Sequence, residues 1–117
     1  MMDNMQEVAG VPLLVGKIDG VDADTLRELT DTFRSEQSSG VAVLATVSND
    51  KPLFIASVSK DLIGKGIKAG DLVREMGKTT GGGGGGAPHL AQAGGRDASK
   101  LDEALALVPS LIEKGVG

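Results

Sequence analysis

The chain has 117 residues, of which 40% are hydrophobic and 24% are charged, and this composition suits a single globular domain. It contains no cysteine, which excludes a disulfide framework, a thiolate zinc site and a cysteine nucleophile, and it contains no apolar run of the roughly twenty residues that a membrane span needs. The formal net charge of -4 argues against nucleic acid as a partner of the whole surface. The acidic N-terminus lacks the basic region of a secretory signal, so we predict a cytoplasmic protein with no membrane partner.

Short apolar runs rich in β-branched residues predict three buried strands, at residues 11–18, 41–47 and 53–58. Between the first two, Leu26, Leu29 and Phe33 recur at helical spacing and predict a helix over residues 23–37, with Asp22 as its N-cap. Turn-forming residues separate the last two strands, which predicts an antiparallel hairpin. The succession of strand, helix and strand predicts a parallel crossover, and therefore a mixed sheet.

The second half predicts a helical turn at residues 60–63, a helix over residues 69–79, a short strand over residues 88–93 and a final helix. The apolar positions of the final helix run from Leu101 to Ile112, and Asp97 or Ser99 can cap its start. Pro109 lies inside this pattern and predicts a kink, or a boundary near Leu107. The predicted fold is a small two-layer α/β domain, with a mixed sheet of about four strands covered by three helices.

Six consecutive glycines, Gly81 to Gly86, have two physical interpretations. They form either a flexible tether or a backbone that another group approaches closely, because no Cβ is in the way. The run joins a predicted helix directly to an apolar segment and contains no serine or charge, which favours a structured loop. Glycine backbone can direct N-H groups at an anion, so a phosphate of RNA or of a nucleotide is the expected ligand class. The order of elements fits neither a Walker loop nor a dinucleotide-binding fold.

The basic residues concentrate around this run, because residues 59–96 hold six Lys/Arg against three Asp/Glu while both flanking segments are acidic. The candidate phosphate contacts are Lys60, Lys65, Lys68, Arg74, Lys78 and Arg96, and for each of them a solvated surface charge is the alternative. The single histidine, His89, is predicted to be a strand residue rather than a catalytic one. The Gln92 amide can bond the glycine loop or the edge of an RNA base. The predicted nucleic-acid-binding set adds these two residues and Gly81, Gly82, Gly83, Gly84, Gly85 and Gly86 to the six cations.

The glycine run continues into Ala87-Pro88-His89-Leu90-Ala91-Gln92-Ala93-Gly94-Gly95, and Asp97 to Ala104 reads DASKLDEA. These motifs closely resemble the DHHA1-type domain that ends alanyl-tRNA synthetases, and the resemblance covers residues 8 to about 114. It implies a domain over residues 8–117. Residues 1–7 are polar, and we predict that they form a frayed stub or truncation scar.

The resemblance implies a non-catalytic domain that contacts the elbow of tRNA-Ala and supports aminoacylation and editing by its parent enzyme. The implied partners are tRNA, the rest of the synthetase chain and, as an option, a second copy of the domain. No cofactor or metal is expected in this fragment. ATP and Mg, with Zn as an option, are expected in the parent enzyme.

Two alternatives come from different classes. A DHHA1 domain attached to a DHH phosphodiesterase or exonuclease would present a nucleotide to a neighbouring active site, but there the glycines directly precede the histidine. Here Ala87 and Pro88 intervene, which favours the synthetase branch. The second alternative is a structural module that dimerises through the first strand or the last helix.

Overall fold

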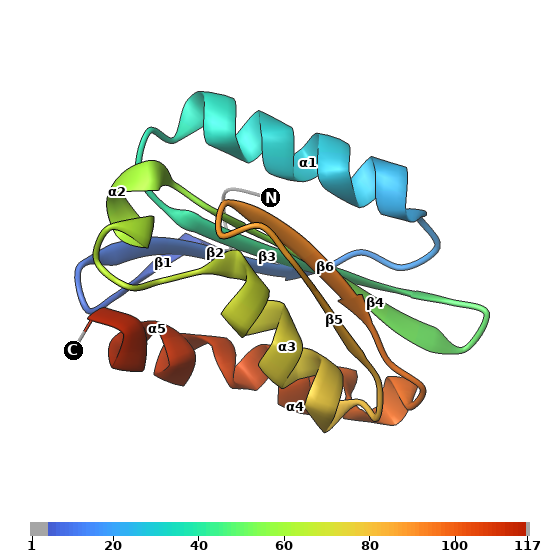
Figure 1. The fold of residues 1–117 in the computed structure, drawn as a ribbon. Coiled ribbons are helices and arrows are strands. Elements are labelled where there is room, and N and C mark those ends of the chain that lie inside the picture. Colours follow the sequence, from blue (N-terminus) through green and yellow to red (C-terminus); the bar gives the residue numbers. More distant parts are fainter. Residues whose placement is uncertain (1–4, 117) are drawn as a thin grey trace.

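The computed structural model describes residues 5–116, which form a mixed six-stranded sheet with helices on both faces (Figure 1). The strands are β1 (Met5–Val8), β2 (Val11–Lys17), β3 (Val41–Ser48), β4 (Lys51–Val58), β5 (Gly83–Gly86) and β6 (Leu90–Gly94). The helices are α1 (Ala23–Glu36), α2 (Lys60–Ile63), α3 (Ala69–Thr79), α4 (Leu101–Ala106) and α5 (Val108–Val116). Within the described residues, no helix has both the length and the apolar character that crossing a membrane requires.

The strands lie in the spatial order β1-β2-β3-β4-β6-β5. Strands β2 and β3 are parallel and joined through α1, while every other neighbouring pair is antiparallel. The predicted mixed sheet, parallel crossover and β3-β4 hairpin are therefore confirmed. The turn of that hairpin contains Asn49 and Asp50, both at positive φ, as the tight turns that match strand twist require.

The sheet has six strands rather than about four, because both of its edges are strands without an apolar pattern. Strand β1 pairs with β2 through a turn at Ala9 and Gly10, so the predicted fraying is wrong for residues 5–7. Residues 1–4 lie outside the described part of the chain. Strand β5 consists of glycines alone.

Helices cover both faces of the sheet, so the domain has three layers rather than the predicted two (Figure 1). On one face, Leu26 and Phe33 of α1 pack on Leu44 and Ile55. On the other face, α3, α4 and α5 bury a larger cluster around Phe54. The physical reason is that β3 and β4 are buried on both faces and therefore need cover on both.

The predicted helix boundaries are confirmed at both ends of the chain. The N-H of Thr25 donates to Oδ1 of Asp22 at 2.9 Å and caps α1, and this bond lowers the pKa of the Asp22 carboxyl. At the C-terminal end the helix breaks at Leu107, so that Pro109 lies in the first turn of α5, where its missing N-H costs nothing.

Asp61 ties the loop before β3 to the start of α2. The hydroxyls of Ser39 and Ser59 each donate to the Asp61 carboxylate at 2.6 Å, and the N-H of Gly40 donates to Oγ of Ser59 at 3.0 Å. The bonds from Ser39 and then Ser59 lower the pKa of Asp61 below its ordinary value. A carboxyl whose pKa is lowered by folding stabilises the folded state above its unfolded pKa, and the contribution is lost as the pH falls through the folded pKa.

We therefore expect the free energy of unfolding to fall as the pH drops below about 4, the ordinary pKa of an aspartate. Asp61→Asn removes the titrating group, so the variant should lose less stability than the wild type between about pH 5 and about pH 2. Urea unfolding at several pH values measures this difference. Equal losses in the two proteins would contradict the role of Asp61.

Candidate nucleic-acid interface

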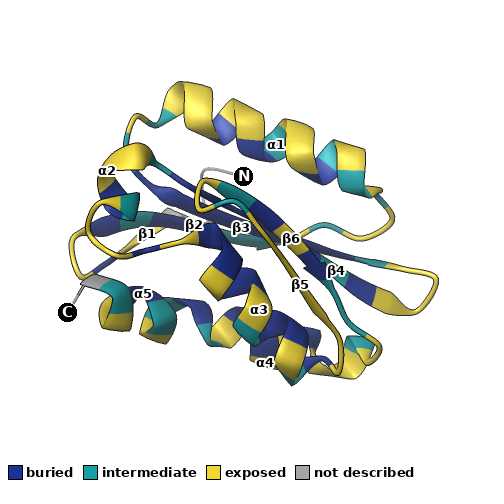
Figure 2. Cartoon of the chain, in the orientation of Figure 1, coloured by how far each residue is buried: buried dark blue, intermediate teal, exposed yellow. Residues whose placement is uncertain are grey.

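The glycine run forms the exposed edge strand β5, so its backbone is ordered but lies in a strand rather than the predicted loop. Residues Gly83 to Gly86 pair with Ala91 to Gly94 of β6 on one side, and all four glycines are exposed (Figure 2). An edge strand leaves one row of backbone N-H and C=O groups unpaired. The N-H of Ala87 donates to Leu90 O at 3.1 Å, so Ala87 faces β6 with its backbone polar groups. Because these groups alternate in direction along an antiparallel ladder, the N-H and C=O of Gly84, three residues earlier, point away from β6.

Every second glycine of the run is required by the packing of β5 on β6. A Cβ on Gly84 would lie 2.5 Å from Cβ of Ala93, and a Cβ on Gly82 would overlap the carbonyl of Gly94. Gly86 has a φ of +156, and a Cβ there would lie 2.9 Å from Cβ of Ala91. A Cβ on Gly83 or Gly85 would meet no described atom within 4 Å. The fold of this domain therefore does not explain why these two positions lack a side chain.

Helix α3 packs directly along β5 through two glycines of its own, seven positions apart and thus on one face of the helix. A Cβ on Gly77 would lie 2.9 Å from Cα of Gly83, and a Cβ on Gly70 would lie 3.2 Å from the carbonyl oxygen of Gly86. Backbone hydrogen bonds join α3 to the segments that flank β5 at both ends of the helix. Gly82 N-H donates to Gly77 O at 2.7 Å, and Ala69 N-H donates to Pro88 O at 2.8 Å.

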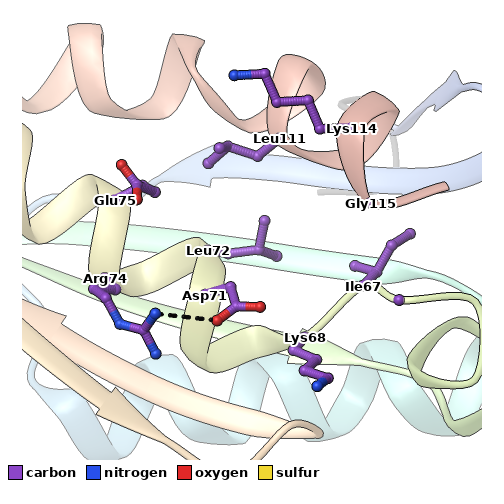
Figure 3. Close-up of a pocket in the computed structure, with 10 residues that line it drawn as sticks. Ile67, Lys68, Asp71, Leu72, Arg74, Glu75, Leu111, Lys114 and Gly115 are labelled. Atoms are coloured by element: carbon purple, nitrogen blue, oxygen red, sulfur yellow. Dashed lines mark ion pairs between the residues drawn. The ribbon is translucent and has the colours of Figure 1, made fainter. Parts of the chain in front are cut away.

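Two of the six predicted cations are paired with acidic neighbours on α3. Arg74 lies 3.3 Å from Asp71, and Lys78 lies 3.5 Å from Glu75. Figure 3 shows the first pair beside a hollow of about 280 Å³ between α3 and α5. That hollow mixes acidic and basic side chains over Leu72 and Leu111 and contains none of the glycines 81–86, which makes it a poor match for an anion.

Lys68 and Arg96 lie at the two ends of the glycine run. Lys68 lines a hollow of about 230 Å³ together with Gly86 and the ion pair of Asp71 and Arg74. Arg96 lies at the other end, where a Cβ on Gly81 would be 3.9 Å from its Cβ. Both side chains are exposed, and neither forms an ion pair with another residue of the described chain. Among the described residues, these two are the predicted cations that lie at the ends of the exposed backbone strand without an ion-pair partner.

The remaining predicted residues lie at different distances from this strand. Lys60 lines a hollow at the C-terminal end of α1, and Lys65 is exposed in the loop after α2, so neither is brought to the glycines. His89 is exposed one residue before β6, and its carbonyl accepts from Val58 N-H at 3.0 Å. Gln92 lies in β6 opposite Gly85.

Arg27 is a candidate residue that the sequence did not indicate. It lies on α1, 65 positions before Gln92, and its Nη2 donates to Oε1 of Gln92 at 3.4 Å. Both side chains line a hollow of about 220 Å³ that includes Gly85 and Gly86. On the sequence Arg27 belongs to the solvated face of an amphipathic helix, so only the packing of α1 on the sheet reveals its position.

The described residues contain no group of three or more His, Cys, Asp or Glu side chains that could hold a metal ion. The site therefore offers exposed backbone, cations and one amide. Groups of these kinds can bind and orient an anionic or polar ligand.

Comparisons with known proteins identify the domain. The model of the DHHA1 domain family matches residues 10–114. The chain is 50% identical over 112 residues to an alanine-tRNA ligase of Dehalococcoides mccartyi and 47% identical over 116 residues to that of Clostridioides difficile. In both cases it covers at least 96% of its own length but only 13% of the relative.

Solved structures agree with the sequence comparisons. The C-Ala domain of Aquifex aeolicus alanyl-tRNA synthetase superposes with a TM-score of 0.85 at 34% identity, covering 97% of this chain and 98% of that one. A Vibrio pGpG-specific phosphodiesterase shares the fold alone, with a TM-score of 0.57 at 13% identity over 36% of its length. The chain belongs to the DHHA1 domain family, as a C-Ala domain of the alanyl-tRNA synthetase type.

Proposed function

We propose that this domain is a tRNA-binding module of an alanine-tRNA ligase and that it carries out no chemistry itself. The observation that carries the proposal is the bare glycine strand β5 with Lys68 and Arg96 at its ends. A strand without side chains lets a sugar-phosphate backbone approach its N-H groups, while the two cations attract the phosphates. Because the net charge of the chain is -4, this attraction is local and orients the RNA on one surface.

The relatives, of which the chain spans 13%, support an alanine-tRNA ligase as the parent enzyme. We propose that the domain contacts the elbow of tRNA-Ala and holds the tRNA near two active sites in the remainder of the chain, one for aminoacylation and one for editing. This raises the effective concentration of the substrate at those sites. In this proposal the parent enzyme, and not this domain, binds ATP, Mg and, as an option, Zn. The parent enzyme acts in the cytoplasm. A second copy of the chain is a further partner.

A titration of the 117-residue chain with tRNA-Ala, and with an unrelated tRNA, at two salt concentrations tests this function. With two phosphates neutralised by Lys68 and Arg96, the logarithm of the binding constant should fall with the logarithm of the salt concentration with a slope of about -2. No binding at low salt, or an affinity that salt does not change, would contradict the proposal. A marked preference for tRNA-Ala is not required, because backbone contacts carry no sequence information.

A further inference from the structure

The hollow beside Arg27 lies on the α1 side of the β5-β6 pair. Helix α1 packs on β3 and β4, and the side chains of β6 that face α1 are Leu90 and Gln92. The hollow of about 220 Å³ that remains is bounded by the Arg27 side chain and by the backbone of Gly85 and Gly86. It is therefore formed jointly by a helix and by the glycine strand.

The chemistry of the hollow differs between its floor and its walls. The floor is apolar, because the side chains of Ile55, which is buried, and Leu90, which is half-buried, form it. The walls carry the guanidinium of Arg27 and the amide of Gln92, two planar groups that lie side by side at a donor-acceptor distance of 3.4 Å. Arg27 forms no ion pair with another residue of the described chain, so its charge is not compensated by a neighbouring carboxylate.

This combination suits a nucleobase better than a phosphate. An apolar floor favours a flat ring, whereas a phosphate alone gains nothing from it. Arginine and glutamine side chains recognise base edges through paired hydrogen bonds. Only 2% of the residues are aromatic, so apolar side chains rather than an aromatic platform face the ring in this hollow.

Gly85 supplies an independent steric observation. It lines the hollow, and a Cβ at this position would meet no described atom within 4 Å, so the fold itself does not exclude a side chain. A methyl group there would project from the rim of the hollow. The absence of a side chain thus keeps the hollow accessible to a ligand.

We infer that the hollow between Arg27, Gln92 and the Gly85-Gly86 backbone binds one unstacked base of the RNA whose phosphates contact Lys68 and Arg96. This inference rests on the proposed function and adds a base-binding site to it. The floor of Ile55 and Leu90 takes the face of the ring, and Arg27 and Gln92 take its edge.

Binding of tRNA-Ala to variants of the 117-residue chain tests the site. Arg27→Ala should weaken binding about tenfold, the loss expected for one charge-assisted hydrogen-bonding group. Arg27→Lys should weaken it nearly as much, because lysine lacks the planar fork of donors that forms paired hydrogen bonds with a base edge. Arg34→Ala is the matched control, since it removes the same charge seven positions along α1 from a residue paired with Asp31 at 3.7 Å. Its affinity should stay within about twofold of the wild type. Equal losses in Arg27→Ala and Arg34→Ala, or full affinity in Arg27→Lys, would overturn the inference.

Gly85→Ala tests the steric part, because it narrows the entrance without a clash inside the domain. It should weaken tRNA binding more than Gly83→Ala does at the other end of the strand. Equal effects of the two substitutions would mean that the RNA contacts the strand along its length rather than at the hollow, which would overturn the inference.

A titration without tRNA separates the failure of the site from the failure of the proposed function. Adenosine and cytidine, which carry no phosphate, should shift the nitrogen-15 amide signals of Gly85, Gly86 and the Gln92 side chain, whereas inorganic phosphate should not. Shifts with phosphate alone, or no shift with either nucleoside, would overturn the inference even if the chain binds tRNA. Shifts with the nucleosides in a chain that does not bind tRNA would support the hollow and contradict the proposed function.

Discussion

Replacing Gly84 by alanine is expected to lower the free energy of unfolding by about 3 kcal/mol, the upper part of the usual range for overpacking. The added Cβ would lie 2.5 Å from both the Cβ of Ala93 and the carbonyl oxygen of Gln92, and it would overlap Cα of Ala93. Neither strand can move away easily, because β6 is also paired with β4 and α3 holds both ends of β5. The edge strand would therefore have to separate from the sheet or distort it.

The matched control is Gly85→Ala, which adds the same methyl group one position further along the strand, where no described atom lies within 4 Å. Its stability should stay within about 1 kcal/mol of the wild type. Urea unfolding measures both variants, and thermal unfolding should show a melting temperature about 10 °C lower for Gly84→Ala. If the two variants were equally stable, the alternating packing of the glycines on β6 would be wrong.

Elements with a strong apolar pattern were predicted from the sequence with nearly their observed limits. The helical spacing of Leu26, Leu29 and Phe33 predicted α1, because a helix with one buried face needs apolar residues at that spacing. The continuous apolar runs predicted β3 and β4, because nearly every side chain of these strands is buried. The break at Leu107 was predicted because Pro109 has no N-H and therefore cannot donate the hydrogen bond that a continuous helix requires at that position.

The two edge strands, β1 and β5, were not predicted, each for its own reason. Strand β1 has only four residues, with Gln6 and Glu7 at its centre, and its pairing with β2 depends on the turn at Ala9 and Gly10. Strand β5 has no side chains from which a pattern could arise. A strand of this kind is defined by its partners in the sheet, which sequence periodicity does not record. The third layer was not predicted, although the continuous apolar runs of β3 and β4 are typical of strands that are buried on both faces, whereas a strand with one solvated face alternates.

The candidate site was predicted only in part. The pairs Asp71-Arg74 and Glu75-Lys78 have the spacing of neighbours on a helix surface, so their mutual neutralisation was readable from the sequence. The spacing of Gly70 and Gly77 likewise marked a helix face capable of close approach. The position of Arg27 beside Gln92 was not readable, since it results from the packing of α1 across the sheet.

Reversing both cations at the ends of the glycine strand, with Lys68→Glu and Arg96→Glu together, is expected to weaken tRNA binding about a hundredfold at low salt. Two charge-assisted contacts are lost, each of which stabilises a complex by about 1.5 kcal/mol or more, and repulsion from the phosphates is added. The double variant Arg34→Glu with Lys100→Glu changes the net charge equally. Its affinity should fall by less than about threefold, because both cations already pair with carboxylates away from β5.

The measurement that tests the binding surface most directly is the salt dependence of tRNA-Ala affinity for the wild type and for the Lys68→Glu, Arg96→Glu variant. Each phosphate contact contributes about one unit to the slope of the logarithm of the binding constant against the logarithm of the salt concentration. The variant should therefore show a slope shallower by about two units than that of the wild type. Equal slopes would show that Lys68 and Arg96 do not contact phosphates, and would contradict the assignment of the glycine strand as the RNA-binding surface.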